Sequence, residues 1–529
     1  MINIFSDLLF VLPLLAFLFL FLLLLKTKPS FGGGGRRRKT PPEPAGGWPV
    51  IGHLHLLGGG LPPHRVLGAF ADRYGPIFTV RLGVHPTVVV SSPESVKECF
   101  TKNDRALAKR PATTHGVYLG YDFSSFGFSH GPYWREVRKL VLQEMLCARR
   151  LEIMTRVRES EVHVSIAELY EAAMNQANSG KVVMTKWLEQ LTLNMIMRMI
   201  NGKRYAGAVH GGAGGGSGGG RPFQEIVREF MYVSGQSVPS DIIPFSPLKW
   251  IDFGGYIKSM RRISEEVGVV CEQWIDEHVA EGRKLDRIEE SDFIDVMLAA
   301  VDDKFTRFGF DHKTIIKATI SGLILAGSDT TSVHMTWIVS LLLNNDQVMQ
   351  RARAEISEKV GNERWVQESD IKNLVYLHAI VKEALRLYPP GPLAVPHEAI
   401  EDCNISGYDI PKGTRVMVNL WKLHRDPSMW TDPDRFVPER FLMENPGVDF
   451  SGHHHEFIPF GSGRRACPGA SFAMQVTYLT IARLLQGFDI TIVSGNGVDM
   501  KEGMGITLVK ESPLEVAVTP RLPSLMYQN

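Results

Sequence analysis

One cysteine lies in a segment whose composition suits a thiolate metal ligand. Cys467 belongs to the loop Phe460-Gly-Ser-Gly-Arg-Arg-Ala-Cys-Pro-Gly469, which directly precedes a predicted helix. The backbone amides of such a loop and the positive end of the helix stabilise sulfur as an anion. Gly463 and Gly469 allow a close turn, and Arg465 can bind a carboxylate. The segment therefore predicts a cysteine thiolate bound to a metal centre that also carries carboxylates.

The alternative for Cys467 is an inert cysteine in a turn. The chain has five cysteines, an odd number without a CxxC pair, so no disulfide framework is predicted. The other four are expected to serve as small core hydrophobes: Cys99, Cys147, Cys271 and Cys403.

A second candidate site lies in an otherwise apolar helix. Asp329 and Thr330 stand next to each other in Ala326-Gly-Ser-Asp-Thr-Thr331. The Thr330 hydroxyl can bond back to the carbonyl of Ala326, which would open the helix locally and leave room for water. The pair suits proton transfer. A polar patch on an amphipathic helix is the alternative.

Two further pairs have helical spacing. Glu383 and Arg386 are three residues apart, and Trp134 and Arg138 are four apart, so each pair shares a helix face. An exposed ion pair between Glu383 and Arg386 would contribute only about 0.3 kcal/mol to the stability of the protein. Trp and Arg both donate hydrogen bonds, which suits a carboxylate ligand. Neither spacing identifies a site by itself.

Taken together, these segments resemble the cytochrome P450 family. The arrangement FxxGxRxCxG, from Phe460 to Gly469, matches that family's haem-ligand signature at all five fixed positions. The threonine segment matches (A/G)Gx(D/E)T(T/S), and Pro438-Glu-Arg-Phe441 matches the PERF motif. The resemblance covers nearly the whole chain after its N-terminal segment. It is closest to the microsomal plant A-type branch of specialised metabolism, through Pro41-Pro-Glu-Pro-Ala-Gly-Gly-Trp-Pro and Arg386-Leu-Tyr-Pro-Pro-Gly-Pro.

The resemblance implies a role for each of these residues. It implies haem b (iron protoporphyrin IX), with Cys467 as the iron ligand in a segment bounded by Phe460 and Gly469. The expected propionate contacts are Trp134, Arg138, His397 and Arg465. Thr330 would hold water beside bound oxygen, and Asp329 would help to relay protons. A buried structural triad would brace the haem loop: Glu383, Arg386 and Arg440.

The resemblance also implies a monooxygenase that inserts one atom of O2 into a small lipophilic substrate. The branch hydroxylates flavonoids, coumarins, lignans, alkaloids and terpenoids. No flavin or nicotinamide motif is evident, so electrons are expected from NADPH-cytochrome P450 reductase, with cytochrome b5 as a second candidate partner. The pocket is expected at Thr113–Ser129, Ile320–Thr330, Leu393–Val395 and Met504–Thr507. The alternatives are a haem-thiolate isomerase or dehydratase acting on a peroxide, and a non-catalytic membrane haem binder.

Composition and hydropathy predict the chain's organisation. Every residue from Leu8 to Leu25 is apolar, so residues 1–25 are interpreted as a single transmembrane anchor. Residues 26–50 form a basic, Pro/Gly-rich tether, and residues 51–529 form the catalytic domain. The basic residues after the span predict that this domain lies on the cytoplasmic side, and the resemblance to microsomal enzymes implies the endoplasmic reticulum membrane. Lys plus Arg (58) and Asp plus Glu (57) nearly cancel, which argues against a nucleic-acid partner.

The predicted fold is mainly helical with small β-sheets, the cytochrome P450 fold, preceded by the transmembrane helix. Two strands are expected, Tyr74–Gly83 and Thr87–Ser91, joined by a turn at Val84-His85-Pro86. Short strands return at Tyr408–Ile410, Arg415–Asn419 and near the C-terminus. Gly211–Gly220 is interpreted as a surface loop. Helical periodicity spans Trp134–Met145, Leu151–Met174, Ile257–Glu281, Lys313–Leu343, Asp346–Val360 and Asn373–Tyr388.

Overall fold

The computed structural model describes most of the chain after residue 37. The described residues are 38–175, 180–204, 221, 223–236, 238–242, 252, 254–282, 291–493, 495 and 497–528. The predicted anchor, the first part of the predicted tether and the Gly211–Gly220 segment lie outside them. Within these ranges, no helix is both long enough and apolar enough to cross a membrane.

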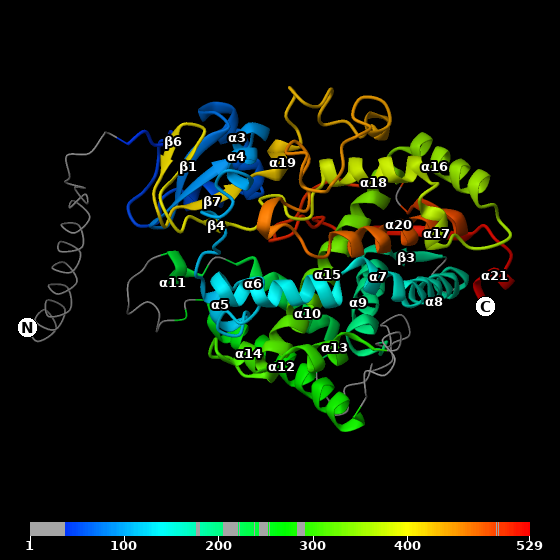
Figure 1. The fold of residues 1–529 in the computed structure, drawn as a ribbon. Coiled ribbons are helices and arrows are strands. Elements are labelled where there is room, and N and C mark those ends of the chain that lie inside the picture. Colours follow the sequence, from blue (N-terminus) through cyan, green and yellow to red (C-terminus); the bar gives the residue numbers. More distant parts are fainter. Residues whose placement is uncertain are drawn as a thin grey trace, which may run out of the picture.

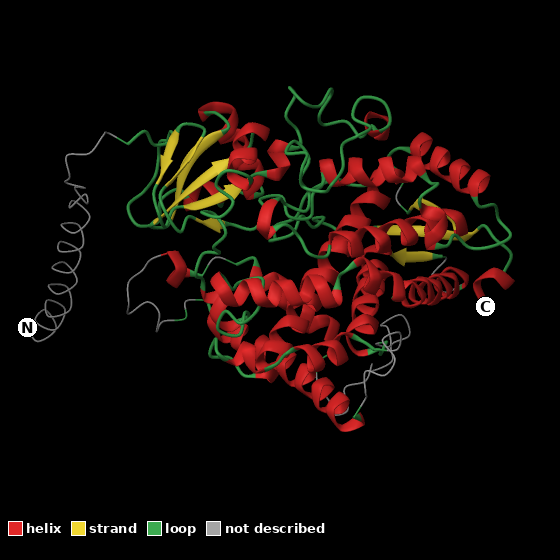
Figure 2. Ribbon diagram, viewed as in Figure 1, coloured by secondary structure: helices red, strands yellow, loops and turns green. Residues whose placement is uncertain are grey.

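The described chain is mainly helical with small sheets, as the sequence predicts (Figures 1 and 2). A four-stranded sheet has the order β1-β2-β7-β4, with β1 (Ile77–Leu82) antiparallel to β2 (His85–Val90) and β2 parallel to β7 (Arg415–Val418). The fourth strand, β4 (His397–Glu398), pairs antiparallel with β7. Segments about three hundred residues apart in sequence thus meet in one sheet, which brings His397 beside the N-terminal part of the chain.

The first hairpin differs from its prediction at both ends. The predicted first strand began at Tyr74, but α3 (Pro63–Tyr74) ends there and Gly75, at φ +97°, stops the helix. The turn lies at Gly83 and Val84, and His85 already belongs to β2. Gly83 has φ +66°, and a Cβ there would lie 2.3 Å from the carbonyl oxygen of Ile242. Glycine therefore fixes the turn earlier than His-Pro.

One long helix, α15 (His312–Leu343), runs through the middle of the helical body (Figure 1). Its 32 residues extend over about 48 Å. The helix begins where the Asp311 side chain accepts a hydrogen bond from the Thr314 amide. Between Ile315 and Leu342 most of its circumference is buried against other helices, so it is a rigid support for Asp329 and Thr330.

Three predicted helices match closely: α12 (Tyr256–Glu281), α16 (Asp346–Lys359) and α18 (Val375–Leu387). Two predictions need correction. The helix from Trp134 is α6 (Gly131–Leu140), followed by a π-helical turn at Val141–Met145. The helix predicted at Leu151–Met174 is broken at Met154 into α7 (Ala148–Ile153) and α8 (Thr155–Met174). Directly after the break, Thr155 and Arg158 bond the distant Glu368, a tertiary contact that periodicity does not reveal.

The longest of the helices that were not predicted is α9 (Met184–Asn201). It is buried on nearly every side between α8, α13 and α15, so it has no polar face to produce an amphipathic pattern. The remaining elements are α2 (Leu54–Leu57), α4 (Pro93–Phe100), α5 (Thr114–Tyr118), α10 (Phe223–Ser234), α11 (Pro239–Ile242), α13 (Phe293–Ala300), α14 (Asp303–Thr306), α17 (Glu368–Ile371), α19 (Leu420–Leu423), α20 (Ala470–Gly487), α21 (Leu525–Gln528), β3 (Lys181–Val183), β5 (Cys403–Ile405), β6 (Tyr408–Ile410), β8 (Phe488–Ile492), β9 (Glu515–Pro520) and the 3-10 turns Pro438–Phe441 and Gly463–Arg465.

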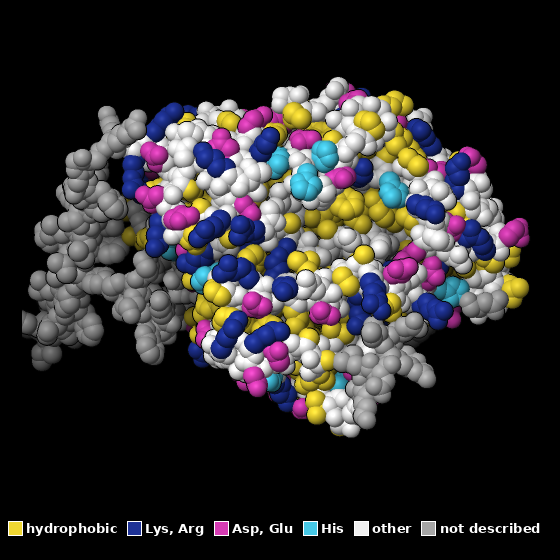
Figure 3. Space-filling model, viewed as in Figure 1, with side chains coloured by type: hydrophobic (Ala, Val, Ile, Leu, Met, Phe, Trp, Pro, Cys, Tyr) yellow, Lys and Arg dark blue, Asp and Glu magenta, His cyan; other side chains and the backbone are white. Residues whose placement is uncertain are grey.

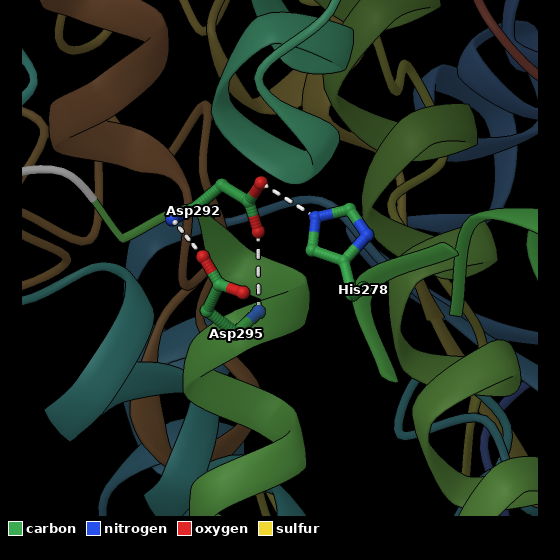
Figure 4. Close-up of side chains that lie close together, drawn as sticks. All are labelled: His278, Asp292 and Asp295. Carbon is green, nitrogen blue, oxygen red and sulfur yellow. Dashed lines mark hydrogen bonds and ion pairs between the residues drawn. The ribbon is translucent and has the colours of Figure 1, made fainter. Parts of the chain in front are cut away.

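A buried cluster of ionisable side chains joins α12 to α13 (Figure 4). His278 Nε2 lies 2.8 Å from Asp292 Oδ2, and its Nδ1 lies 2.7 Å from the carbonyl oxygen of Trp274. Because both ring nitrogens face oxygen acceptors, the geometry fits a protonated imidazolium. Burial lowers the pKa of His278, but the hydrogen bond and charge of Asp292 outweigh burial and raise it overall. Asp292 and Asp295 also form the capping box of α13, so the cluster is explained as a helix start.

The surface carries no large field of one sign on the face shown. Basic and acidic side chains are interspersed over most of it (Figure 3). This distribution agrees with the near balance of 58 basic and 57 acidic residues.

Candidate active site

The cysteine loop is closed by its own backbone. The Cys467 amide donates to the Phe460 carbonyl at 2.8 Å, which folds the segment back on itself. Gly463 has φ +68°, and a Cβ there would lie 2.5 Å from Asp104 Oδ1. Asp104 instead accepts hydrogen bonds from the Arg464 amide and guanidinium at 3.0 and 3.1 Å. Glycine is therefore required at 463, and the loop is held against the chain after α4.

Cys467 has exposed surface and lines a cavity of about 480 Å³. Burial raises the pKa of its thiol, while the Gly469 amide and the charge of Arg138 act in the opposite direction. A backbone amide donor and a nearby positive charge are the surroundings expected for a thiolate. A metal ion at the sulfur would outweigh burial and deprotonate the thiol.

The four predicted propionate contacts all line this same cavity: Trp134, Arg138, His397 and Arg465. Arg465 stacks on Trp134, with its Cζ 3.9 Å from the ring centroid, and donates to the carbonyls of Ala108 and Ser129. Trp134 Nε1 is buried without a hydrogen-bond partner among the described residues. Burial, followed by the charges of Arg110 and Arg138, lowers the pKa of Arg465 to about 9.

Sequence reasoning missed Arg110, which lines the cavity beside these residues. Its Nη1 donates to the carbonyls of Val395 and Pro396 at 2.6 and 2.9 Å. Its Nε is buried without a partner in the described chain, and burial lowers its pKa to about 10. The only signal in the sequence is an arginine before Pro111 in a loop, a pattern too common to select it.

These cations face no carboxylate of the protein. Among the described residues, those that line the cavity include no Asp or Glu. Three buried guanidinium groups together with an unpaired indole N–H would be unfavourable without anionic partners. The cluster therefore fits a ligand that brings its own carboxylates.

His397 fits such a ligand in one protonation state only. Its Nδ1 donates to the Leu107 carbonyl at 2.7 Å, so Nε2 can donate only when the ring is protonated. Burial, and next the charge of Arg110, lowers its pKa to about 3. A carboxylate at Nε2 would favour the imidazolium form.

The structure also brings together Glu383, Arg386 and Arg440, all fully or almost fully buried. Arg386 donates to both oxygens of Glu383 at 2.7 and 2.8 Å, and Arg440 Nε donates to Oε1 at 3.0 Å. The Val437 amide adds a fourth bond to the same carboxylate. The remaining guanidinium donors reach backbone carbonyls of the segment that leads to the cysteine loop: His424, Thr431, Pro433 and Arg435.

Asp329 and Thr330 lie on α15. The Thr330 hydroxyl donates to the Ala326 carbonyl at 2.6 Å, the bond expected from the sequence, and Thr330 lines the cavity. The helix nevertheless stays continuous through this point, so the expected local opening is absent in the described helix. Burial raises the pKa of Asp329 to about 6, against a lowering by Thr507. A carboxyl with that pKa can both release and accept a proton near neutral pH.

The predicted pocket segments all reach the cavity, through Leu119, Ser125, Leu323, Ala394 and Ile506, among others. Two helices supply walls that were not predicted, α9 and α10. Their cavity residues are Ile196, Met199, Ile200, Phe230, Met231 and Ser234. The lining is almost entirely apolar away from the arginine cluster, which suits a lipophilic ligand.

Comparison with known proteins agrees with this geometry. The family model for cytochrome P450 matches residues 41–518. The chain belongs to the cytochrome P450 family. Vinorine hydroxylase of Rauvolfia serpentina is 48% identical over 496 residues, covering 93% of this chain and 92% of that protein. A nicotine N-demethylase of Nicotiana tabacum is 45% identical, covering 97% of each chain. A flavonoid-6-hydroxylase of Ocimum basilicum is 46% identical, covering 92% of each chain.

Solved structures show the same fold. A zebra fish cytochrome P450 with abiraterone has a TM-score of 0.69 at 26% identity, covering 87% of this chain and all of that one. This P450 is therefore a haem b monooxygenase that uses O2, a lipophilic substrate and a redox partner reductase. Haem b, with one iron and two propionates, fits the residues present, because Cys467 offers the sulfur and the unpaired cationic cluster offers the propionate site.

Proposed function

We propose that this P450 inserts one oxygen atom into an uncharged, lipophilic plant specialised metabolite, most simply by hydroxylation. The observation that supports this proposal is the cavity, which Cys467 and Thr330 line together with mostly apolar residues. No Asp or Glu is among the described residues that line it. A protonated amine there would lose its hydration without gaining a carboxylate partner. The candidate classes are flavonoids, coumarins, lignans and terpenoids, and alkaloids in their neutral form.

Each of the site residues would have its own role in this reaction. Cys467 would hold the haem iron, and Trp134, Arg138 and Arg465 would bind the propionates, with Arg110 and protonated His397 beside them. The haem, once bound, supplies the activation of O2, to which a thiolate ligand contributes electron density. Thr330 would hold a water molecule, and Asp329 would deliver protons through it. Phe460 and Gly469 are the first and last residues of the loop that would keep the sulfur in place.

We also propose the cellular setting. The apolar segment at residues 8–25 and the basic residues after it support a single-pass anchor in the endoplasmic reticulum membrane, with the catalytic domain in the cytoplasm. Electrons would come from NADPH-cytochrome P450 reductase, and cytochrome b5 is a second candidate donor. Arg38 and Lys39, within the proposed tether, bond Asp402 and Asp409, so the second half of the tether would lie against the sheet-rich part of the molecule.

Neither alternative function gains support. The relatives named above are hydroxylases and a demethylase. A peroxide isomerase or dehydratase can dispense with the acid and threonine pair, which this chain retains on α15. A non-catalytic haem binder needs neither that pair nor a substrate cavity.

The test combines membranes that carry this protein with the reductase, NADPH and a panel of plant phenolics, terpenes and alkaloids. A carbon monoxide difference spectrum first establishes intact haem–thiolate, and Cys467→Ala should abolish it. We expect an NADPH-dependent product one oxygen atom heavier from an uncharged panel member. Quaternary-ammonium analogues of the same alkaloids are the matched controls. Turnover of the quaternary forms in preference to neutral compounds would overturn the proposed substrate class.

A further inference from the structure

A threonine far away in sequence bonds the carboxyl group of Asp329. Thr507 Oγ1 donates to Asp329 Oδ2 at 2.9 Å, across 178 positions of the chain. Among the described residues, Thr507 is the one hydrogen-bond donor to that carboxyl group. Thr507 is 8% exposed and lines the cavity together with its neighbour Ile506. The bond therefore joins a cavity wall to the acid of α15.

The segment that carries Thr507 is pinned on one side and open on the other. Leu508 is fixed twice, because its carbonyl accepts from Trp337 Nε1 at 2.5 Å and its amide donates to the Pro390 carbonyl at 2.9 Å. Trp337 belongs to α15 and is fully buried. By contrast, Met504 and Ile506 are 58% and 47% exposed. Thr507 thus lies between Leu508, which is fixed to α15, and the exposed residues Met504 and Ile506, which can contact a ligand.

No charged group among the described residues competes with Thr507 for the carboxyl group of Asp329. Burial raises the pKa of Asp329 and the charge of Glu189 on α9 adds to this increase, while Glu189 itself is bound to Arg228 of α10 at 2.6 and 3.0 Å. His334, one turn further along α15, is buried, and burial lowers its pKa to about 3, so it stays neutral. No described cation pairs with Asp329. The Thr507 hydroxyl is therefore the local group that favours the carboxylate form.

We propose that Thr507 is a positioning residue of the monooxygenase reaction, whose hydroxyl orients the Asp329 carboxyl group for proton delivery and links it to the cavity wall at Ile506 and Thr507. The proposal rests on the proton-delivery role of Asp329 and Thr330. In that step the carboxyl O–H bond of Asp329 breaks, an O–H bond forms to a water held by Thr330, and that water releases one of its own protons to the oxygen substrate. The carboxylate keeps the Thr507 hydrogen bond until a proton from solvent restores the acid.

The chain offers a crossed pair of variants that separates positioning from packing. Thr507→Val keeps the shape and removes the donor, whereas Thr507→Ser keeps the donor and removes a methyl group. With reductase, NADPH and a neutral coumarin that the panel shows to be a substrate, we expect Thr507→Val to divert electrons into peroxide. The fraction recovered as product should fall about threefold to tenfold. Thr507→Ser should couple like the parent. A residue that only packs would give the reverse pattern, which would overturn the proposal.

A second readout requires no turnover. Infrared difference spectra of the resting enzyme against pH follow the carbonyl band of protonated Asp329, which Asp329→Asn identifies by removing it. Loss of the Thr507 donor should raise the midpoint of this titration by about one pH unit, and Thr507→Ser should leave it unchanged. An unchanged midpoint in Thr507→Val would contradict the proposal. If Asp329→Asn itself couples normally, the proton-delivery role fails; if it uncouples while Thr507→Val does not, only the Thr507 inference fails.

Discussion

Two sides of the cavity are held by different kinds of contact. On the cysteine side, the loop Phe460–Gly469 is supported by the Glu383–Arg386–Arg440 triad, where one buried carboxylate accepts four hydrogen bonds. On the α15 side, Asp329 is held by a single hydroxyl from a partly exposed segment. A network of buried charges resists any displacement, whereas one neutral donor can be exchanged for water. We therefore expect the cysteine side to hold the cofactor in place and the α15 side to respond to the substrate.

The largest expected effect comes from breaking the triad. Glu383→Gln removes a charge and leaves two buried guanidinium groups without their partner. We expect a loss of about 3–5 kcal/mol in the free energy of unfolding and little or no carbon monoxide spectrum. The control is Glu444→Gln, because Glu444 lies 3.8 Å from Arg440 but its side chain is 51% exposed. Thermal unfolding and haem content of both variants test this expectation. A stable, haem-loaded Glu383→Gln protein would contradict the idea that the triad holds the cysteine side of the cavity rigid.

The next effect concerns the cationic cluster. Arg110→Gln should speed the loss of haem about tenfold, because one buried cation beside the expected propionates is removed. The haem-free protein should be at least as stable as the parent, since an uncompensated buried charge has been relieved. Transfer of haem to an acceptor protein measures the first quantity, and chemical unfolding measures the second. Arg105→Gln, at a nearby exposed arginine, is the control and should change neither.

Thr330→Ala tests the α15 side itself. We expect the carbon monoxide spectrum and the stability to persist, while NADPH consumption yields peroxide instead of product. Thr336→Ala is a matched control, because Thr336 makes the same backward bond on α15, to the Ser332 carbonyl at 2.8 Å, in the buried core. Full coupling in Thr330→Ala, measured as product formed per NADPH, would remove this residue from the proton path.

The smallest effect is a pH dependence of stability away from the cavity. The pKa of His278 is raised in the folded protein, so its stabilisation is fully present below the unfolded value of about 6.5 and is lost as pH rises through the folded value. The difference in unfolding free energy between the parent and His278→Gln should reach about 1 kcal/mol near pH 6 and shrink above pH 8. Unfolding at both pH values checks it, with half-exposed His454→Gln as the control. A difference that grows with pH would mean that the buried ring is neutral.

Residues close together in sequence were the most predictable parts of the site. The loop around Cys467 was recognised from five positions within ten residues, and the Thr330–Ala326 bond followed from helical spacing alone. The long helix α15 was predicted to within one residue of its observed start, because its apolar run and its Asp311 cap are local signals. Each of these features depends on neighbours that the chain itself supplies.

Other parts were decided only when distant segments met. Arg110 bonds residues 285 and 286 positions away, and Thr507 bonds Asp329 across 178 positions. The residues of α9 and α10 come to line the cavity only through the tertiary fold. A helix buried on every side, such as α9, has no polar face for periodicity to reveal. The sequence alone indicated the family and the class of chemistry, which the comparisons confirm, and it predicts Cys467 as the iron ligand. The tertiary structure decided which cations gather without acids and which hydroxyl holds the acid, because burial and charge pairing depend on the whole surroundings of a group.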